Sequence, residues 1–280
     1  MKNVRLAAAL LVAAALPAAA QTDAEPPRSL LLTRQGWDAG VQASRYKYEE
    51  PNLPQNALNG GAVSQVDLTG NRGGVVGAYN FTNPEHWFTR IDARISYGSL
   101  KYVGSGTQYG VKDWIAEGRV VSGKDLLLGG SVSLSPYAGL GYRYLYDDSR
   151  GTSTLNGVDY NGYRRYSNYL YAPVGVTMRF SGGERWVISP TVEYDAFIQG
   201  KQVSKLSDAV SGGPSVTNDQ SDGYGYRAYL MLETERWTFG PWLHYWSIKD
   251  SNVVPISSTV GIMEPANWTR EYGLEFRYRF

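Results

Sequence analysis

The histidines are the first groups to consider for catalysis, because the 280-residue chain holds only two, His86 and His244. A serine hydrolase needs a histidine base beside its nucleophile, and the serine nearest to His244 in the sequence is Ser247. Residues three apart on an extended strand point to opposite faces. We therefore expect a structural role for His244, a turn position for His86, and no catalytic residue.

Carboxylates and arginines offer a second kind of chemistry. Glu193 and Asp195 are two residues apart, a spacing that places both on one face of a strand and suits a general acid–base pair. Arginines recur at the same spacing, as in Arg90 and Arg94 on either side of Asp92. Because isolated charges are costly in a confined interior and paired charges are tolerated, ion pairing is the favoured interpretation. The predicted network consists of Arg90, Asp92, Arg94, Glu117, Arg119, Arg143, Glu193, Asp195, Arg227, Glu275 and Arg277.

Strands are the elements that must hold these charges, because apolar residues alternate with polar ones along much of the chain. Trp87, Ile91 and Ile95 share one face of such a segment, and its opposite face carries charge. Ten segments show this pattern, at about 36–48, 72–82, 87–101, 112–121, 129–146, 166–180, 186–199, 223–234, 237–248 and 268–280.

The connections between these segments alternate between short and long. Short turns are followed by longer stretches rich in Gly, Ser, Asn and Asp, at 49–71, 102–111, 147–165, 200–222 and 249–267. A soluble sandwich has no reason to sort its loops in this way. The pattern predicts an all-β fold for residues 36–280: a transmembrane, antiparallel, up-and-down β-barrel of about ten strands, with long extracellular loops and short periplasmic turns.

Tryptophans provide an independent indication of a membrane. Trp37, Trp87, Trp186 and Trp237 stand at the beginning of four predicted strands that run in the same direction. The tryptophan ring favours the boundary between lipid and water. We therefore predict that these four residues form part of an aromatic girdle at the periplasmic side.

The N-terminus predicts export. Lys2 and Arg5 precede an apolar run that ends before three alanines, which is the pattern of a signal peptide cleaved after Ala20. Residues 1–20 are assigned to this peptide and residues 21–35 to a periplasmic extension. The chain has no cysteine, and its net charge of +1 gives no support to nucleic-acid binding.

The last strand carries the most specific motif. Tyr272, Leu274, Phe276, Tyr278 and Phe280 alternate with polar residues and finish on the terminal phenylalanine. In this respect the chain resembles the outer-membrane β-barrel proteins of Gram-negative bacteria. The resemblance implies an integral outer-membrane location and recognition of this strand by the barrel-assembly machinery during insertion. It covers the mature chain by architecture and only the last strand by motif.

Ten strands are also the number in the omptins, the outer-membrane proteases that use paired aspartates and a His–Asp dyad near the outer rim. The resemblance is in strand count only. His86 is predicted at the opposite end of the barrel, and the long connections contain no histidine. None of the omptin catalytic positions is carried over to this chain.

The function expected from these features is non-enzymatic and needs no cofactor or metal. Barrels of eight strands are filled by side chains, and those of 16–18 strands leave a channel, so ten strands with mixed charges predict a largely filled lumen. The expected contacts of the surface loops are lipopolysaccharide, through Arg164 and Arg165, or an unidentified external partner. Two alternatives stay open: a narrow channel for small solutes or ions, and a surface hydrolase.

Four prolines conflict with regular strands. Pro136, Pro173, Pro190 and Pro241 fall within predicted strands, where proline removes a hydrogen-bond donor and is normally confined to edges or bulges. A closed barrel has no edge. We therefore expect bulges near Pro190 and Pro241.

Overall fold

The computed structural model describes residues 28–51, 53, 63–183 and 185–280. The predicted signal peptide, 1–20, and residues 21–27 of the predicted extension lie outside this range. Among the described residues, ten long strands form the barrel, as predicted. They are β1 (Gly36–Glu50), β2 (Val66–Thr82), β3 (Trp87–Gly104), β4 (Gly106–Lys124), β6 (Val132–Leu155), β7 (Val158–Ser181), β8 (Val187–Lys205), β10 (Gly223–Glu233), β11 (Trp237–Ile248) and β14 (Asn267–Arg279).

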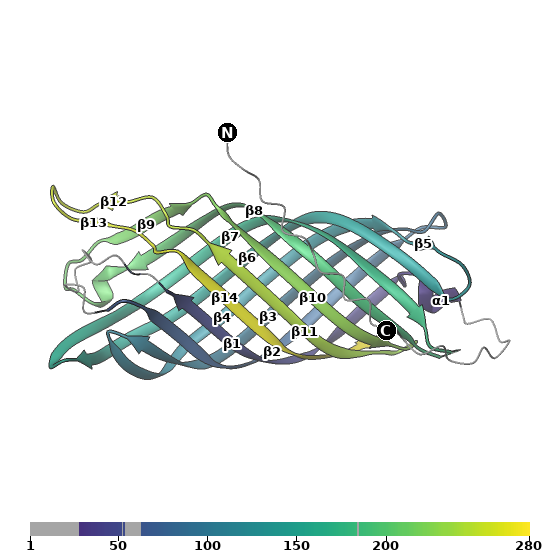
Figure 1. The fold of residues 1–280 in the computed structure, drawn as a ribbon, viewed down its shortest axis with the longest axis horizontal. Coiled ribbons are helices and arrows are strands. Elements are labelled where there is room, and N and C mark those ends of the chain that lie inside the picture. Colours follow the sequence, from purple (N-terminus) through teal and green to yellow (C-terminus); the bar gives the residue numbers. More distant parts are fainter. Residues whose placement is uncertain (1–27, 52, 54–62, 184) are drawn as a thin grey trace.

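Each of these strands pairs antiparallel with its neighbours, and the ring closes where β1 pairs with β14. β8 pairs with β10, so no long strand is left with a free edge along its whole length. Figure 1 shows the strands tilted around a long cylinder. We call the end at which β1 begins and β14 finishes the terminal end, and the opposite end the hairpin end.

Short helices and strands lie at both ends of the barrel. At the terminal end lie α1 (Arg28–Leu31) and β5 (Leu126–Leu127), and at the hairpin end lies β9 (Ser215–Gln220), which extends the sheet from β8. The hairpin end also carries the 3-10 turn η1 (Leu206–Asp208) and the pair β12 (Val254–Pro255) and β13 (Gly261–Ile262). No helix in the described part of the chain is long and apolar enough to cross a bilayer.

Two connections predicted as loops are strands instead. Residues 102–111 continue β3 and β4 and leave only Ser105 between them. Residues 147–165 extend β6 and β7 into a hairpin whose turn, Asn156–Gly157, has positive φ at both positions (53° and 77°). Asn-Gly is the preferred sequence for a two-residue turn of this kind, because both residues tolerate positive φ. The loop prediction was wrong here because polar composition outweighed the turn signal.

The prolines are accommodated without the bulges that we expected. The pairing register is the same on both sides of Pro190 and of Pro241, so the expectation of bulges there was wrong. Each proline keeps its partner on one neighbouring strand, Leu230 for Pro190 and Leu274 for Pro241. On the other neighbour the pairing is interrupted locally. The backbone N–H of a strand residue donates to one neighbouring strand only. The missing N–H of proline therefore removes one hydrogen bond between strands and leaves the register unchanged.

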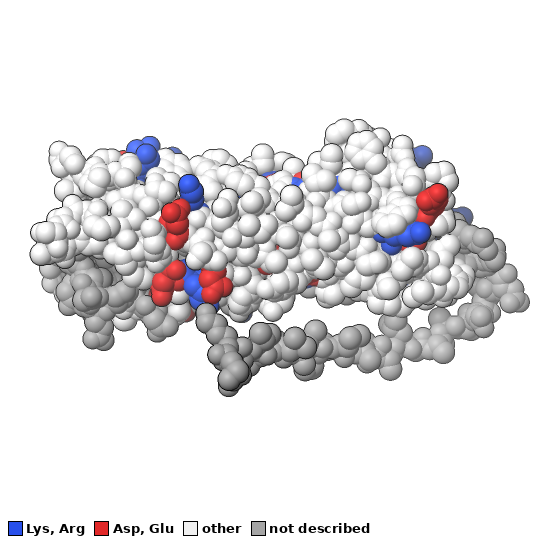
Figure 2. All heavy atoms as spheres, turned by 90° about the horizontal axis from the view of Figure 1, so that it is seen from above, with Lys and Arg blue, Asp and Glu red and all other residues white. Residues whose placement is uncertain are grey.

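The outer surface carries two groups of aromatic residues. Trp37, Trp87, Trp186 and Trp237 are exposed near the terminal end, where Trp37 contacts Tyr79 and Trp237 contacts Phe276. A second group faces outward toward the hairpin end and includes Trp114, Tyr144, Tyr146, Tyr166, Tyr245 and Trp268. Figure 2 shows charged side chains gathered toward the two ends, with a largely uncharged band between them. This arrangement is typical of a barrel in a bilayer.

The alternation of β1 reverses its polarity along the strand. From Trp37 to Ala43 the outward residues are apolar, and buried polar residues such as Gln42 face inward. Beyond Ser44 the outward residues are charged, beginning with Arg45, and the buried residues are aromatic, beginning with Tyr46. The directions of the side chains do not change, since the register of β1 with β2 is continuous. We infer that the strand leaves the hydrocarbon region near Ser44.

The outward face should therefore be sensitive to charge in a way that depends on depth. Ile91→Arg and Val192→Arg, at positions 47% and 60% exposed to the surroundings of the barrel, should each lower the free energy of unfolding in lipid vesicles by about 2 to 4 kcal/mol. The matched control is Thr107→Arg, at an exposed site of the hairpin end, which should cost little. Equal costs at Ile91 and Thr107 would contradict the assigned membrane position.

Candidate functional site

The charged residues predicted to face the lumen meet in its middle, around Glu117. Its carboxylate accepts hydrogen bonds from Arg94 Nε (2.8 Å), from Arg227 Nη2 (2.5 Å) and from the Tyr171 hydroxyl (2.6 Å). Arg94 and Glu117 lie on adjacent strands, whereas Arg227 approaches from the opposite wall of the barrel. Glu117 thus bridges the lumen from one wall to the other.

The network continues from Glu117 toward the terminal end. Arg227 Nε lies 2.7 Å from Asp195 and 3.0 Å from Glu193, and Glu193 accepts from Arg119 Nη1 at 2.7 Å. Arg119 also donates to Asp92 at 2.9 Å. Nearest the terminal end, Asp38 binds Arg277 (2.7 Å) and Arg90 (3.1 Å), and Arg277 also binds Glu275 (2.5 Å). We call this set of ion pairs the charge layer.

Arg143 differs from the other predicted members. Its side chain is buried, but no described carboxylate lies within ion-pair distance of it, and its Nε and Nη1 have no hydrogen-bond partner among the described residues. The guanidinium instead lies over the ring of Trp246, 5.2 Å from the centroid. Two further members, Arg72 and Asp113, were missed; Arg72 donates a hydrogen bond to Asp113. Arg72 was the first and Asp113 the second residue of its predicted strand, and the alternation continues beyond both.

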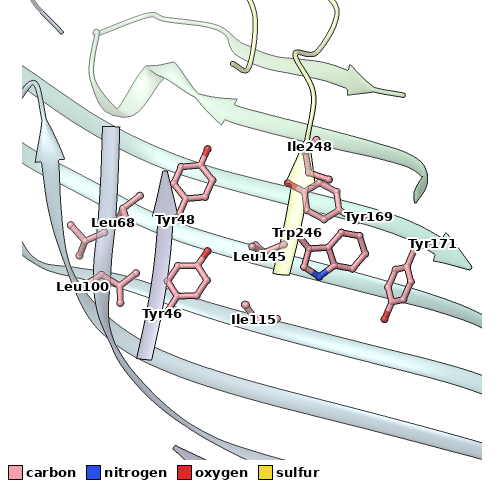
Figure 3. Packing of buried hydrophobic residues seen from close by; sticks show 11 residues of the cluster. Tyr46, Tyr48, Leu68, Leu100, Ile115, Leu145, Tyr169, Tyr171, Trp246 and Ile248 are labelled. Carbon is pink, nitrogen blue, oxygen red and sulfur yellow. The ribbon is translucent and has the colours of Figure 1, made fainter. Parts of the chain in front are cut away.

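An apolar and aromatic layer fills the lumen between the charge layer and the hairpin end (Figure 3). Trp246 is its largest member, 1% exposed, with the ring of Tyr171 edge-on at 5.0 Å. Its residues come from seven of the ten strands, so the layer crosses the whole lumen. The members are Tyr46, Tyr48, Leu68, Leu100, Val111, Ile115, Leu145, Tyr169, Tyr171, Trp246 and Ile248. We call this set the aromatic layer; of its members only Trp246 was expected from the sequence to face the lumen.

His244 belongs to the wall of this filled lumen. It is buried, its Nε2 lies 2.6 Å from the hydroxyl of Tyr229, and its ring contacts Trp242 at 4.5 Å. Among the described residues, no serine hydroxyl is hydrogen-bonded to it. His86 lies in the turn before β3 with a positive φ of 67°. The two histidines therefore occupy the positions that the sequence predicted, and neither is paired with a nucleophile.

The terminal end contains a polar cavity of about 170 Å³ that the chain itself crosses. α1 is fixed beside β6, β7 and β8, where Leu31 packs against Val187 and accepts a hydrogen bond from Ser133. Thr33 then binds Asp125 through its backbone N–H, at 2.6 Å. From there residues 34–36 reach β1, five strands away around the ring from β7. Residues 31–36 thus form a strap across the terminal mouth.

A second buried cluster lies at the hairpin end, beyond the aromatic layer. Arg165 Nη1 lies 2.8 Å from Glu50 and 3.7 Å from Glu264, and its Nε lies 3.7 Å from Asp147. The Tyr48 hydroxyl is within hydrogen-bond distance of both Glu50 (2.7 Å) and Glu264 (3.1 Å). These five residues, which we call the hairpin-end cluster, combine three carboxylates with one guanidinium. No group of His, Asp or Glu within the described ranges has the geometry of a metal site.

The arginines expected to meet lipopolysaccharide are otherwise engaged. Arg165 points inward to the hairpin-end cluster, and Arg164 is paired with Asp208 at 2.7 Å. A group of other cations faces outward on the hairpin half, from β14, β1, β3 and β4. Cross-strand pairing aligns Arg270 with Lys47, Lys47 with Thr69, and Thr69 with Lys101. With Arg45 and Lys112 on either side, these outward residues form a set that we call the cation row: Arg45, Lys47, Lys101, Lys112 and Arg270.

Comparison with solved structures supports the barrel assignment. The outer membrane protease OmpT of Escherichia coli is 13% identical and matches with a TM-score of 0.57, over 87% of this chain and 96% of its own. The translocator domain of the Neisseria meningitidis autotransporter NalP matches at 12% identity with a TM-score of 0.37, over 90% and 91% of the two chains. Ail, the attachment invasion locus protein of Yersinia pestis, matches at 10% identity with a TM-score of 0.30, over 88% and 100%. No protein-family model and no curated protein matches.

At these identities the likeness concerns the fold alone. Together with the closed barrel of ten strands, it gives the chain the fold of the Gram-negative outer-membrane β-barrel proteins, as the terminal motif predicted. A protease has a similar fold, but a likeness at 13% identity says nothing of activity. The activity of this chain must therefore be argued from its own residues.

Removing Glu117 should destabilise the barrel strongly. Glu117→Ala leaves Arg94 and Arg227, both buried, without the carboxylate that they share. Loss of one partner of a buried ion pair costs about 3 to 5 kcal/mol. The unfolding free energy, measured by denaturant titration in vesicles, should fall by that amount, and Arg150→Ala, which removes an exposed partner of Asp148, should have little effect. Equal stability of Glu117→Ala and the wild type would contradict this account, because it would show that water solvates Arg94 and Arg227 in the lumen.

Proposed function

We propose that the protein is a non-enzymatic surface barrel of the outer membrane, closed to solutes, whose outer face binds the phosphate groups of lipopolysaccharide. The termini are then periplasmic, and the hairpin end faces the cell exterior. The cation row is the observation that carries this proposal. It lies just beyond the point at which β1 reverses its polarity, where a barrel meets the head groups of the outer leaflet.

Most of the cation row has no internal carboxylate partner, although Arg45 donates a hydrogen bond to Asn71 at 3.2 Å. Within the described part of the chain, no carboxylate lies within 4.0 Å of Arg45, Lys101, Lys112 or Arg270, and only Lys47 is paired, with Glu49 and Asp67. Neighbouring strands are about 4.8 Å apart, so the row from Arg270 to Lys101 spans about 14 Å. Clustered Lys and Arg side chains at a membrane surface attract anionic head groups, and arginine binds phosphate in a bidentate manner. Such a row suits more than one phosphate of the same lipid.

Trp268 supports a position of the row at the lipid boundary. Lys47 Nζ lies 5.0 Å from the centre of its ring and the Arg270 guanidinium 5.8 Å. A tryptophan between two cations suits a site where acyl chains end and head groups begin.

Two features support a closed, non-enzymatic barrel. The charge layer and the aromatic layer lie one above the other in the lumen; the aromatic layer consists of buried side chains, and the charge layer of buried and partly buried ones. This filling disfavours the narrow channel. His244 is buried within the same filling, which disfavours the surface hydrolase. The outward aromatic residues Phe276, on β14, and Phe280, directly after it, are exposed on the segment that would be presented to the barrel-assembly machinery.

The phosphate proposal is tested by the affinity of the purified barrel for lipopolysaccharide. The variant combining Arg45→Ala, Lys101→Ala and Arg270→Ala should lose about 1 kcal/mol per cation, so its dissociation constant should rise by about 150-fold. The measurement is a titration of detergent-solubilised barrel followed by native mass spectrometry. Raised salt should weaken the wild-type complex, because exposed charges are screened.

The matched control is Lys201→Ala, which removes an outward cation of β8 on another side of the barrel. This variant should bind lipopolysaccharide like the wild type. Unchanged binding by the triple variant, or an equal loss in Lys201→Ala, would contradict a specific site on the cation row.

A further inference from the structure

The segment between β11 and β14 covers part of the hairpin end and is fixed on two sides. Residues 249–266, which we call the cover loop, include β12 and β13. On one side the amide of Asn218, from β9, donates to the backbone oxygens of Asn252 and Ile262, both at 2.9 Å. These contacts are neutral and do not depend on pH. On the other side the loop reaches the hairpin-end cluster through Glu264 alone among the described side chains.

The contacts of Tyr48 with Glu50 and Glu264 require one more proton than these groups carry when both glutamates are ionised. The hydroxyl of Tyr48 lies within hydrogen-bond distance of one oxygen of Glu50 and one oxygen of Glu264. A tyrosine hydroxyl has a single proton and can satisfy one carboxylate as a donor. The second contact is favourable only if a carboxylic acid donates to the tyrosine oxygen.

The position of Arg165 decides which carboxyl group holds the extra proton. Its guanidinium lies 2.8 Å from Glu50 and 3.7 Å from Glu264, so Glu50 is the ionised partner. Glu264 is buried and has no closer cation among the described residues. With both glutamates and Asp147 ionised, one guanidinium would face three buried negative charges, an arrangement that burial makes costly.

We propose that Glu264 is a proton-binding latch, which holds the cover loop on the mouth of the barrel while protonated and releases it on ionisation. The groups that face it come from three strands: Tyr48 and Glu50 from β1, Asp147 from β6, and Tyr163, Arg165 and Tyr169 from β7. Ionisation of Glu264 would leave two acceptors, its own carboxylate and that of Glu50, competing for the hydroxyl of Tyr48. The contacts to Asn218 would keep the base of the loop in place.

The direction of the pH dependence follows from the environment of Glu264. Burial raises the pKa of Glu264 to about 7, from an ordinary 4.5; Arg165 opposes this rise, and Glu50 and Asp147 add to it. The docked loop therefore retains a proton that the undocked loop gives up. Docking is strongest below the ordinary pKa and is lost progressively as the pH rises through 7. Between pH 5 and pH 8 the docking equilibrium should weaken by about 70-fold.

A single spin label on the cover loop tests the latch. The chain has no cysteine, so Ser258→Cys, at an exposed position of the loop, gives one labelling site. In vesicles, the mobile component of the nitroxide spectrum should grow as the pH rises from 5 to about 8 and should level off above that. In the additional variant Glu264→Gln, whose amide stays neutral and can donate to Tyr48, the spectrum should be independent of pH.

A control variant and a measurement on the unmodified protein complete the test. Glu49→Gln changes the neighbour of Glu50 that faces outward, and should leave the midpoint unchanged. Hydrogen exchange of the cover loop in the unmodified protein, corrected for the intrinsic effect of pH, should show the same opening if Glu264→Gln fails to fold. A flat pH response in the wild type, or an unchanged midpoint in Glu264→Gln, would overturn the proposal.

Discussion

The structure depends on one constraint: a charge on the inner face of a narrow barrel must find an opposite charge across or along the lumen. Glu117 shows how this is met, because it joins Arg94 from the adjacent strand to Arg227 from the far wall. Shared carboxylates of this kind let arginines fill space that smaller polar residues would leave to water. The strands can then present an apolar outer face to lipid, since most of their charged side chains are paired inside.

The reversal of polarity along the strands organises the two halves of the molecule. In the membrane half, charges lie inside and apolar residues outside; in the hairpin half, aromatic residues such as Tyr46 lie inside and cations such as Arg45 lie outside. The hairpin half is thus built like a soluble barrel around the aromatic layer. The cation row and the hairpin-end cluster both belong to this half, one on its outer surface and one at its mouth. A continuous register carries the strands through both environments.

Much of the barrel follows from local pattern. Period-two alternation was enough to find ten strands and to place residues such as Arg90 and Asp92 on the inner face, because side-chain direction is fixed by the strand itself. Partners across the lumen were not predictable. Glu117 and Arg227 are 110 residues apart, and their contact depends on the diameter and stagger of the closed barrel. The hairpin-end cluster likewise joins Glu50, Arg165 and Glu264 from distant segments.

Other features were readable and were missed. Asn156–Gly157 signalled a tight hairpin, and the inward turn of Tyr46 and Tyr48 between charged neighbours signalled that apolar residues no longer faced lipid. Trp246 was expected to face the lumen, but the rest of the aromatic layer and the cation row were missed. The accommodation of the prolines, in contrast, was not readable from the sequence. Only the pairing of the strands shows that the loss of one hydrogen bond leaves the register unchanged.

The central claim is that the lumen is closed by its own side chains. Single-channel recording in planar bilayers tests it most directly, on purified wild-type barrel and on Arg94→Ala. A filled lumen predicts no steady ohmic conductance in the wild type, and reduced stability in the variant. A steady wild-type conductance, whose ion preference shifts in Arg94→Ala while the stability stays the same, would contradict the claim and establish a water-filled channel.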